Sequence, residues 1–169
     1  MNDVAFLGSQ LLQGYADDPW HGPSTVALLA GLTAEEAAAR PVAGAHSIWE
    51  LVLHMTAWQN EVRGRLGGKP ATFPSEGDWR LPAEISGAAW DAAQKDLGDS
   101  LAALLADLGS QAGADLEETV GSLSSRDPKV VTRVTRAVVL SGLLQHNAYH
   151  SGQIALLRKG LRRGIAAAG

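Results

Sequence analysis

The 169-residue sequence contains no cysteine. It therefore cannot form disulfides, cannot offer a thiolate of its own as a nucleophile, and cannot build a sulfur-rich metal site. Residues 1–18 have neither a basic start nor a long apolar core, so no secretory signal is expected. No stretch approaches the roughly 20 apolar residues that span a bilayer. These absences favour a cytoplasmic protein with no membrane partner.

Aromatic residues and concentrated positive charge are also scarce. Only 5% of the residues are aromatic, and the formal net charge is −4. The basic residues are scattered, except for a terminal run formed by Arg158, Lys159, Arg162 and Arg163. Phosphate binding needs a concentrated cationic face, so nucleic acid is not an expected partner. The terminal run is explained by the end of a predicted helix, where positive charge complements the helix dipole.

Small and aliphatic residues make up much of the chain instead. Apolar residues account for 46% of the sequence and charged residues for 19%, which is a soluble globular composition. A chain of this length can bury a sizeable core as one ordinary domain. No linker, internal repeat or change of composition divides it. We therefore expect a single domain over residues 1–169.

Apolar residues recur at intervals of three and four along the chain, which indicates helices, and no run alternates clearly enough to predict a strand. Capping boxes at Thr33–Glu36 and Ser47–Glu50 mark two helix starts, and Asp127 before a proline marks a third. The sequence predicts an all-α fold, a four-helix bundle with short extra helices and one long loop at about residues 67–82. The long helices are expected at about residues 3–15, 47–66, 83–108 and 130–161, and the short ones at about 26–31 and 34–40.

The placement of the histidines is the most informative feature for function. His146 and His150 are four residues apart, so on a helix they lie ~40° apart on one face. That face is otherwise apolar and should point into the bundle. His54 lies in a similar apolar stripe on an earlier helix. Three inward imidazoles from two helices can hold one divalent ion and leave its other positions open to water or substrate.

A simpler interpretation stays open, because a buried histidine usually has an ordinary hydrogen-bond partner and a pair at i, i+4 is a weak metal signal. Three unpaired imidazoles in one apolar core would nevertheless be costly without a shared partner, which favours the metal. Of the other two histidines, His46 is expected at the surface or in a turn. His21, Trp58 and the loop residue Trp79 are candidate pocket residues.

Longer motifs surround these histidines, and together they are specific. The motifs are residues 20–24 (WHGPS), residues 44–54 (GAHSIWELVLH) with Trp58, and residues 145–154 (QHNAYHSGQI). The sequence resembles the DinB/YfiT-like superfamily of bacterial four-helix-bundle metalloenzymes over almost the whole chain, to about Lys159. The resemblance implies that His54, His146 and His150 are the metal ligands, that the ion is zinc or nickel, and that the protein is a homodimer.

The resemblance and the open site together imply a divalent-metal-dependent enzyme that acts on a small-molecule substrate. The characterised members of that superfamily include thiol-dependent transferases and isomerases that use low-molecular-weight thiols, while many members have no assigned activity, so a thiol-dependent transferase is the leading hypothesis. One alternative is a metal-dependent hydrolase, although no carboxylate lies on the two histidine stripes to act as a base. Another is a non-catalytic, metal-stabilised module for ligand binding or stress response. The sequence does not identify catalytic residues beyond the metal ligands.

Overall fold

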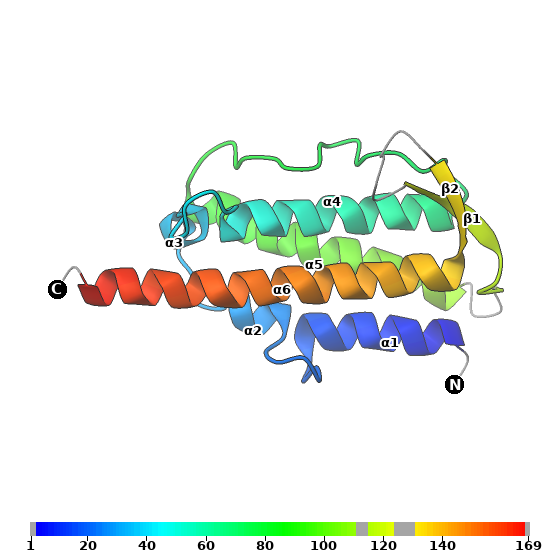
Figure 1. Cartoon of the computed structure of the whole chain (residues 1–169), viewed down its shortest axis with the longest axis horizontal. Coiled ribbons are helices and arrows are strands. Elements are labelled where there is room, and N and C mark those ends of the chain that lie inside the picture. Colours follow the sequence, from blue (N-terminus) through cyan, green and yellow to red (C-terminus); the bar gives the residue numbers. More distant parts are fainter. Residues whose placement is uncertain (1–2, 111–114, 124–130, 168–169) are drawn as a thin grey trace.

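A computed structural model describes residues 3–110, 115–123 and 131–167 of the chain. The long helices lie side by side along the longest axis of the molecule (Figure 1). Helix α4 (Ile48–Leu66) packs against α5 (Gly87–Ser110) and α6 (Arg136–Ala167), and α1 (Asp3–Ala16) packs against the same two helices. The all-α bundle is therefore confirmed. Within the described residues, no helix combines the length and the hydropathy needed to cross a membrane.

Two short helices and a capping box position the start of α4. Helices α2 (Thr25–Leu29) and α3 (Ala34–Ala38) precede it, as the sequence predicts. The Ser47 hydroxyl accepts a hydrogen bond from the Glu50 amide at 3.2 Å, and the Glu50 carboxylate accepts one from the Ser47 amide at 2.8 Å. This reciprocal capping fixes the first turn of α4, and therefore the face of the helix on which His54 lies.

The long loop after α4 covers residues 67–86, and it ends later than expected. Helix α5 was predicted to begin near residue 83 but begins at Gly87. The reason is Ser86, whose hydroxyl accepts a hydrogen bond from the Ala89 amide at 3.2 Å and so caps the helix. The loop consequently runs the full length of α4 (Figure 1).

A small antiparallel sheet precedes the last helix, and the prediction that the chain has no strands was wrong. Strand β1 (Thr119–Leu123) pairs with β2 (Val131–Thr135), and Val120 lies opposite Val134. The β-branched residues of β2 favour an extended backbone over a helix. Helix α6 therefore begins at Arg136 rather than near residue 130, and it continues to Ala167. The helix start predicted at Asp127 lies outside the described residues.

The apolar core has two clusters, and the conspicuous polar residues of α6 fall between them. On α6, Leu143 belongs to one cluster and Ile154 to the other. On α4, Val62 and Leu66 belong to the cluster of Leu143, and Val52 and Met55 belong to the cluster of Ile154. His146 and His150 thus occupy a stretch of α6 that contributes no aliphatic side chain to either buried cluster. The fold leaves a polar section in the middle of the bundle.

Candidate metal centre

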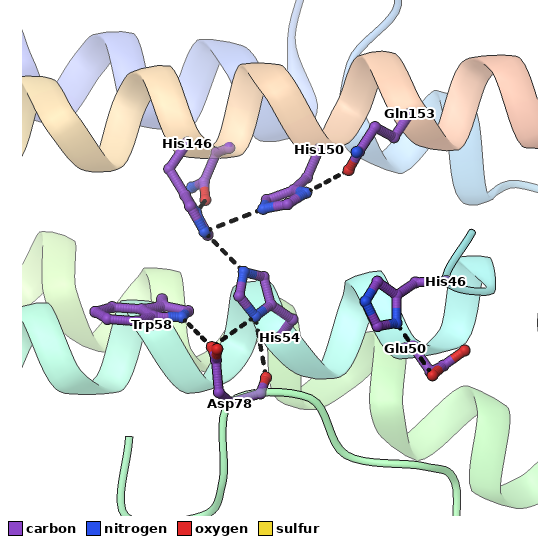
Figure 2. Close-up of polar contacts among 9 residues, drawn as sticks. His46, Glu50, His54, Trp58, Asp78, His146, His150 and Gln153 are labelled. Atoms are coloured by element: carbon purple, nitrogen blue, oxygen red, sulfur yellow. Dashed lines mark hydrogen bonds and ion pairs between the residues drawn. The ribbon is translucent and has the colours of Figure 1, made fainter. Parts of the chain in front are cut away.

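Three histidine rings meet in this polar section, as Figure 2 shows. His54 projects from α4, and His146 and His150 project from the facing helix α6. The Nε2 atom of His146 lies 2.9 Å from Nε2 of His54 and 3.1 Å from Nε2 of His150. One ring nitrogen from each histidine lies within 4.8 Å of the others. The geometry that the periodicity predicted, convergence from two helices, is present.

Burial keeps the three rings uncharged near neutral pH. His54 and His150 are each only 5% exposed, and His146 is half-buried. Burial is the largest cause that lowers the pKa of His146, to about 4, and repulsion from His150 and His54 adds to it. Burial also lowers the pKa of His54 and of His150. Neutral imidazole is the form that binds metal ions.

Each ring has an oxygen acceptor at its other nitrogen, Nδ1. The Nδ1 atom of His54 lies 3.0 Å from the Asp78 carbonyl oxygen and 3.1 Å from its carboxylate. His150 Nδ1 lies 2.6 Å from Gln153 Oε1, and His146 Nδ1 lies 3.5 Å from Asn147 Oδ1. Such outer partners are typical of histidines that bind metal ions, because they fix the tautomer and the orientation of the ring.

These acceptors decide which ring nitrogens carry the protons. A carbonyl oxygen can only accept, so the proton of neutral His54 lies on Nδ1 and Nε2 carries a lone pair. The same reasoning applies to His150 and the amide oxygen of Gln153. His146 Nε2 faces both lone pairs and carries at most one proton, so it can satisfy only one of them. A cation among the three Nε2 atoms would satisfy every ring, and the residues present therefore fit a divalent metal ion.

The loop of residues 67–86 supplies the Asp78 acceptor and is attached to α4 at two points. Near its start, the Arg65 guanidinium donates to the Thr72 carbonyl at 3.0 Å. Farther along, the Trp58 indole N–H donates to the Asp78 carboxylate at 2.7 Å. Asp78 therefore joins Trp58 and His54, two residues of the same face of α4 (Figure 2). These contacts hold the loop across the histidine cluster.

The neighbouring loop residue, Trp79, lies between two histidine rings. Its ring centre is 3.8 Å from that of His54 and 3.7 Å from that of His46, and both pairs are parallel to within 3°. Trp79 therefore covers one face of His54. His46 was expected at the surface or in a turn; its side chain is 42% exposed, but one face of its ring is covered by Trp79.

His46 also has a carboxylate partner. Its Nδ1 atom lies 3.3 Å from Glu50 Oε1, and the same oxygen accepts a hydrogen bond from Arg40 at 2.6 Å. Burial alone would raise the pKa of Glu50, but hydrogen bonds from Ser47 and His46 and the charge of Arg40 outweigh it and lower that pKa. Glu50 is therefore an ionised carboxylate that holds His46 in place.

The three candidate pocket residues do not all lie at the cluster. Trp58 and Trp79 do, since the Trp58 ring centre is 6.3 Å from that of His54 and 6.2 Å from that of His146. His21 is exposed and lines a separate small hollow beside Gly14 and Tyr15. In the described part of the chain, it is not a member of the group that can hold a metal ion.

A helical bundle with three convergent histidines on two facing helices defines the structural class. The chain belongs to the DinB superfamily, whose family model matches residues 20–154 and so includes all three histidines. Searches of the curated proteins and of the solved structures found no match to the chain. The family and the histidine cluster are together compatible with metal binding.

Proposed function

We propose that the protein is a divalent-metal-dependent enzyme in which His54, His146 and His150 hold the ion, and that it transfers a small-molecule thiol. The observation that carries the metal assignment is the convergence of three Nε2 atoms whose rings each direct Nδ1 toward an oxygen. Neutral imidazoles bind zinc, nickel, copper and iron, and we expect zinc or nickel because the family resemblance implies these two.

The composition of the site supports an open coordination sphere. Among the described residues, the group that can hold the ion contains these three histidines and no carboxylate. Three protein ligands are typical of catalytic rather than structural zinc sites. When bound, the ion would act as a Lewis acid that lowers the pKa of a thiol and favours the nucleophilic thiolate.

The chain's own residues would prepare the site for this chemistry. Asp78 and Gln153 orient His54 and His150, and Trp79 shields one face of His54 from water. In the transfer, a bond forms between the thiol sulfur and an electrophilic carbon of the second substrate. The bond from that carbon to its leaving group breaks, the leaving group keeps the electron pair, and the thiol proton passes to solvent.

Thiol transfer is preferred to hydrolysis because of how the nearest carboxylate is used. Hydrolysis at such a site is usually assisted by a general base close to the metal-bound water. Asp78 accepts hydrogen bonds from the Trp58 indole and from His54, so its carboxylate is engaged in orienting a ligand. A thiol that ionises at the metal needs no such base. Hydrolysis and non-catalytic ligand binding remain the alternatives that the experiments below must separate.

Metal content is the first test. Protein purified without an affinity tag should contain about one zinc or nickel ion per chain by elemental analysis. His54→Ala, His146→Ala and His150→Ala should each lose it, whereas His21→Ala should not, because His21 lies outside the cluster. Retention of the ion by all three cluster variants would overturn the assignment. Circular dichroism of each variant separates loss of metal from loss of fold.

Activity is the second test. Metal-loaded protein is incubated with common bacterial low-molecular-weight thiols and electrophilic acceptors, and thioether formation is followed by mass spectrometry. We expect product with wild-type protein and none with His146→Ala. Hydrolysis of ester, amide or phosphate substrates without any thiol transfer would favour the hydrolase. Metal binding with neither reaction would favour the non-catalytic module.

A further inference from the structure

An apolar cavity adjoins the histidine cluster at the N-terminal side of α4. It has a volume of about 310 Å³ and lies between the segment that precedes α4 and one turn of α6. Among the described residues, its walls consist of Val42, Gly44, Ala45, His46, Leu51, Gln153, Leu156 and Leu157, and none of these is an acid, a lysine or an arginine. A volume near 300 Å³ is at the lower end of the range for small-molecule sites.

The two polar side chains of this cavity both belong to the surroundings of the metal centre. Gln153 accepts the hydrogen bond from His150, and His46 stacks on the ring of Trp79, which in turn stacks on His54. Figure 2 shows both residues beside the three histidines, Gln153 on α6 and His46 before α4. The cavity therefore has an apolar body and one polar wall, and that wall is shared with the cluster.

A larger cavity in the molecule has different chemistry. It measures about 570 Å³, lies between α4, α5 and the long loop, and contains none of the three cluster histidines. Four acids and two arginines line it, namely Glu76, Glu84, Asp96, Asp99, Arg63 and Arg80. A substrate bound there would not share a wall with the metal centre. Position and polarity both favour the smaller cavity for a substrate that reacts at the histidines.

We propose that the smaller cavity binds the apolar part of the substrate, a neutral aliphatic or aromatic group, and directs the polar end toward Gln153 and His46. The role of that polar end rests on the proposed function, whereas occupation of the cavity does not require the metal. Two exposed aliphatic side chains on the cavity wall, Val42 at 49% and Leu156 at 68%, would lose contact with water when the group binds.

The polar wall offers hydrogen bonds of a defined kind. Because Gln153 accepts from His150 through Oε1, its NH₂ group is the donor that it can offer to a ligand. His46 uses Nδ1 toward Glu50, which leaves Nε2 as the ring atom available to a ligand. The expected substrate thus combines an uncharged apolar body with a head group that contains an acceptor oxygen or nitrogen for the Gln153 NH₂ group.

Binding of N-phenyl-1-naphthylamine, a neutral apolar fluorophore, tests this proposal on the whole metal-free protein. We expect saturable binding, and Leu156→Asp should weaken it at least about tenfold because a carboxylate in the wall is costly to desolvate. Leu12→Asp is the matched control. Leu12 is an exposed leucine on α1 that lines a cavity of about 250 Å³, and no histidine is among the described residues that line this cavity. That variant should change the affinity by less than about twofold.

Two results would overturn the proposal. The first is absence of probe binding, or equal weakening by both variants, while circular dichroism shows that the proteins are folded. The second is that the wild type is a dimer in sedimentation and does not bind the probe, while Leu156→Asp is a monomer. The cavity surface would then be an interface between two copies of the chain. Probe binding without metal uptake contradicts the proposed function alone, and metal uptake without probe binding contradicts this inference alone.

Discussion

His54 and His46 lie on opposite faces of the same tryptophan ring and have the same kind of partner. Each stacks in parallel on Trp79, and each has Nδ1 near a carboxylate, at 3.1 Å from Asp78 for His54 and at 3.3 Å from Glu50 for His46. Their side chains nevertheless differ in exposure, at 6% for His54 and 42% for His46. The two histidines have nearly the same stacking and carboxylate partners, so the difference between them is how deeply each ring is buried in the bundle.

Depth determines what the free nitrogen of each ring can reach. His54 lies on the inner face of α4, so its Nε2 meets the two histidines of α6. His46 precedes the N-cap of α4, outside the helix, and it borders the apolar cavity instead. The comparison indicates that a carboxylate–histidine pair alone does not place a ring in the group that could hold a metal ion. The second helix, α6, makes the difference.

The largest expected effect in this comparison is on metal affinity. His54→Ala removes one of the three proposed ligands. Changes to the outer partners of such ligands weaken metal binding by about 10- to 100-fold, and we expect a larger loss here. His46→Ala should leave the affinity unchanged, because His46 is not a member of the metal-holding group. Competition titration with a chelator measures both constants. Equal losses in the two variants would mean that His46 is a ligand.

Removing the charge of Asp78 should also lower the metal affinity, by less than the loss of His54, whereas removing the charge of Glu50 should not. Asp78→Asn keeps the backbone carbonyl that accepts from His54 Nδ1 at 3.0 Å but removes the carboxylate charge. We expect about a 10-fold loss of metal affinity, the lower end of the range for such partners. Glu50→Gln should have no effect in the same titration. A loss in Glu50→Gln as large as that in Asp78→Asn would contradict the distinction.

The helices could be predicted from the sequence because periodicity and capping are local signals. Ser47 and Glu50 are three residues apart, and their reciprocal hydrogen bonds form as the pattern predicts. The strand at Val131–Thr135 was missed because its pairing with Thr119–Leu123 is not local. Arg158 shows the same limit. It was assigned to the end of its own helix, but its guanidinium donates to the carbonyls of Ala27, Leu28 and Ala30 at the end of α2.

In the candidate site, too, the residues with a local sequence signal could be predicted and those brought in by the loop could not. The histidines of α4 and α6 were found because helical spacing places them on inward faces. Asp78 lies on an irregular loop, where no period indicates its direction, and only the folded loop brings it to His54. Gln153 had a usable signal, since it follows His150 by three residues on the same helix and its side chain can reach the ring. His46 was expected at the surface or in a turn because it precedes the capping residue Ser47; its stacking on Trp79 depends on the same loop and could not be predicted.

Removal of the shared tryptophan tests whether the two histidines are held together. Trp79→Ala deletes two parallel ring contacts and should lower the free energy of unfolding by about 1–2 kcal/mol. Trp20→Ala is the control, because Trp20 is fully exposed at 103% and should change stability by less than about 0.5 kcal/mol. Urea unfolding of both metal-free proteins gives the values. Equal stability of the two variants would show that the stack contributes little.

The smallest effect concerns the pH dependence of stability in Glu50→Gln. The pKa of Glu50 lies below its ordinary value of 4.5, because its hydrogen bonds and Arg40 together outweigh the effect of burial. A carboxylate with a lowered pKa in the folded state stabilises the protein fully above the ordinary pKa. As the pH falls below 4.5, Glu50 takes up a proton in the unfolded chain before it does so in the folded protein. The stabilisation therefore decreases from about pH 4.5 downward and is gone once the pH is below the lower pKa of the folded state.

Glutamine retains the capping hydrogen bond from the Ser47 amide but carries no charge. The wild type should therefore be more stable than Glu50→Gln by about 1 kcal/mol or less at pH 7, since the Arg40 side chain is 50% exposed. This difference should shrink as the pH falls below 4.5. Urea titrations of both proteins at several pH values measure it. A difference that is constant with pH would mean that Glu50 acts through its shape rather than its charge, and the likeness to the Asp78–His54 pair would then be geometric only.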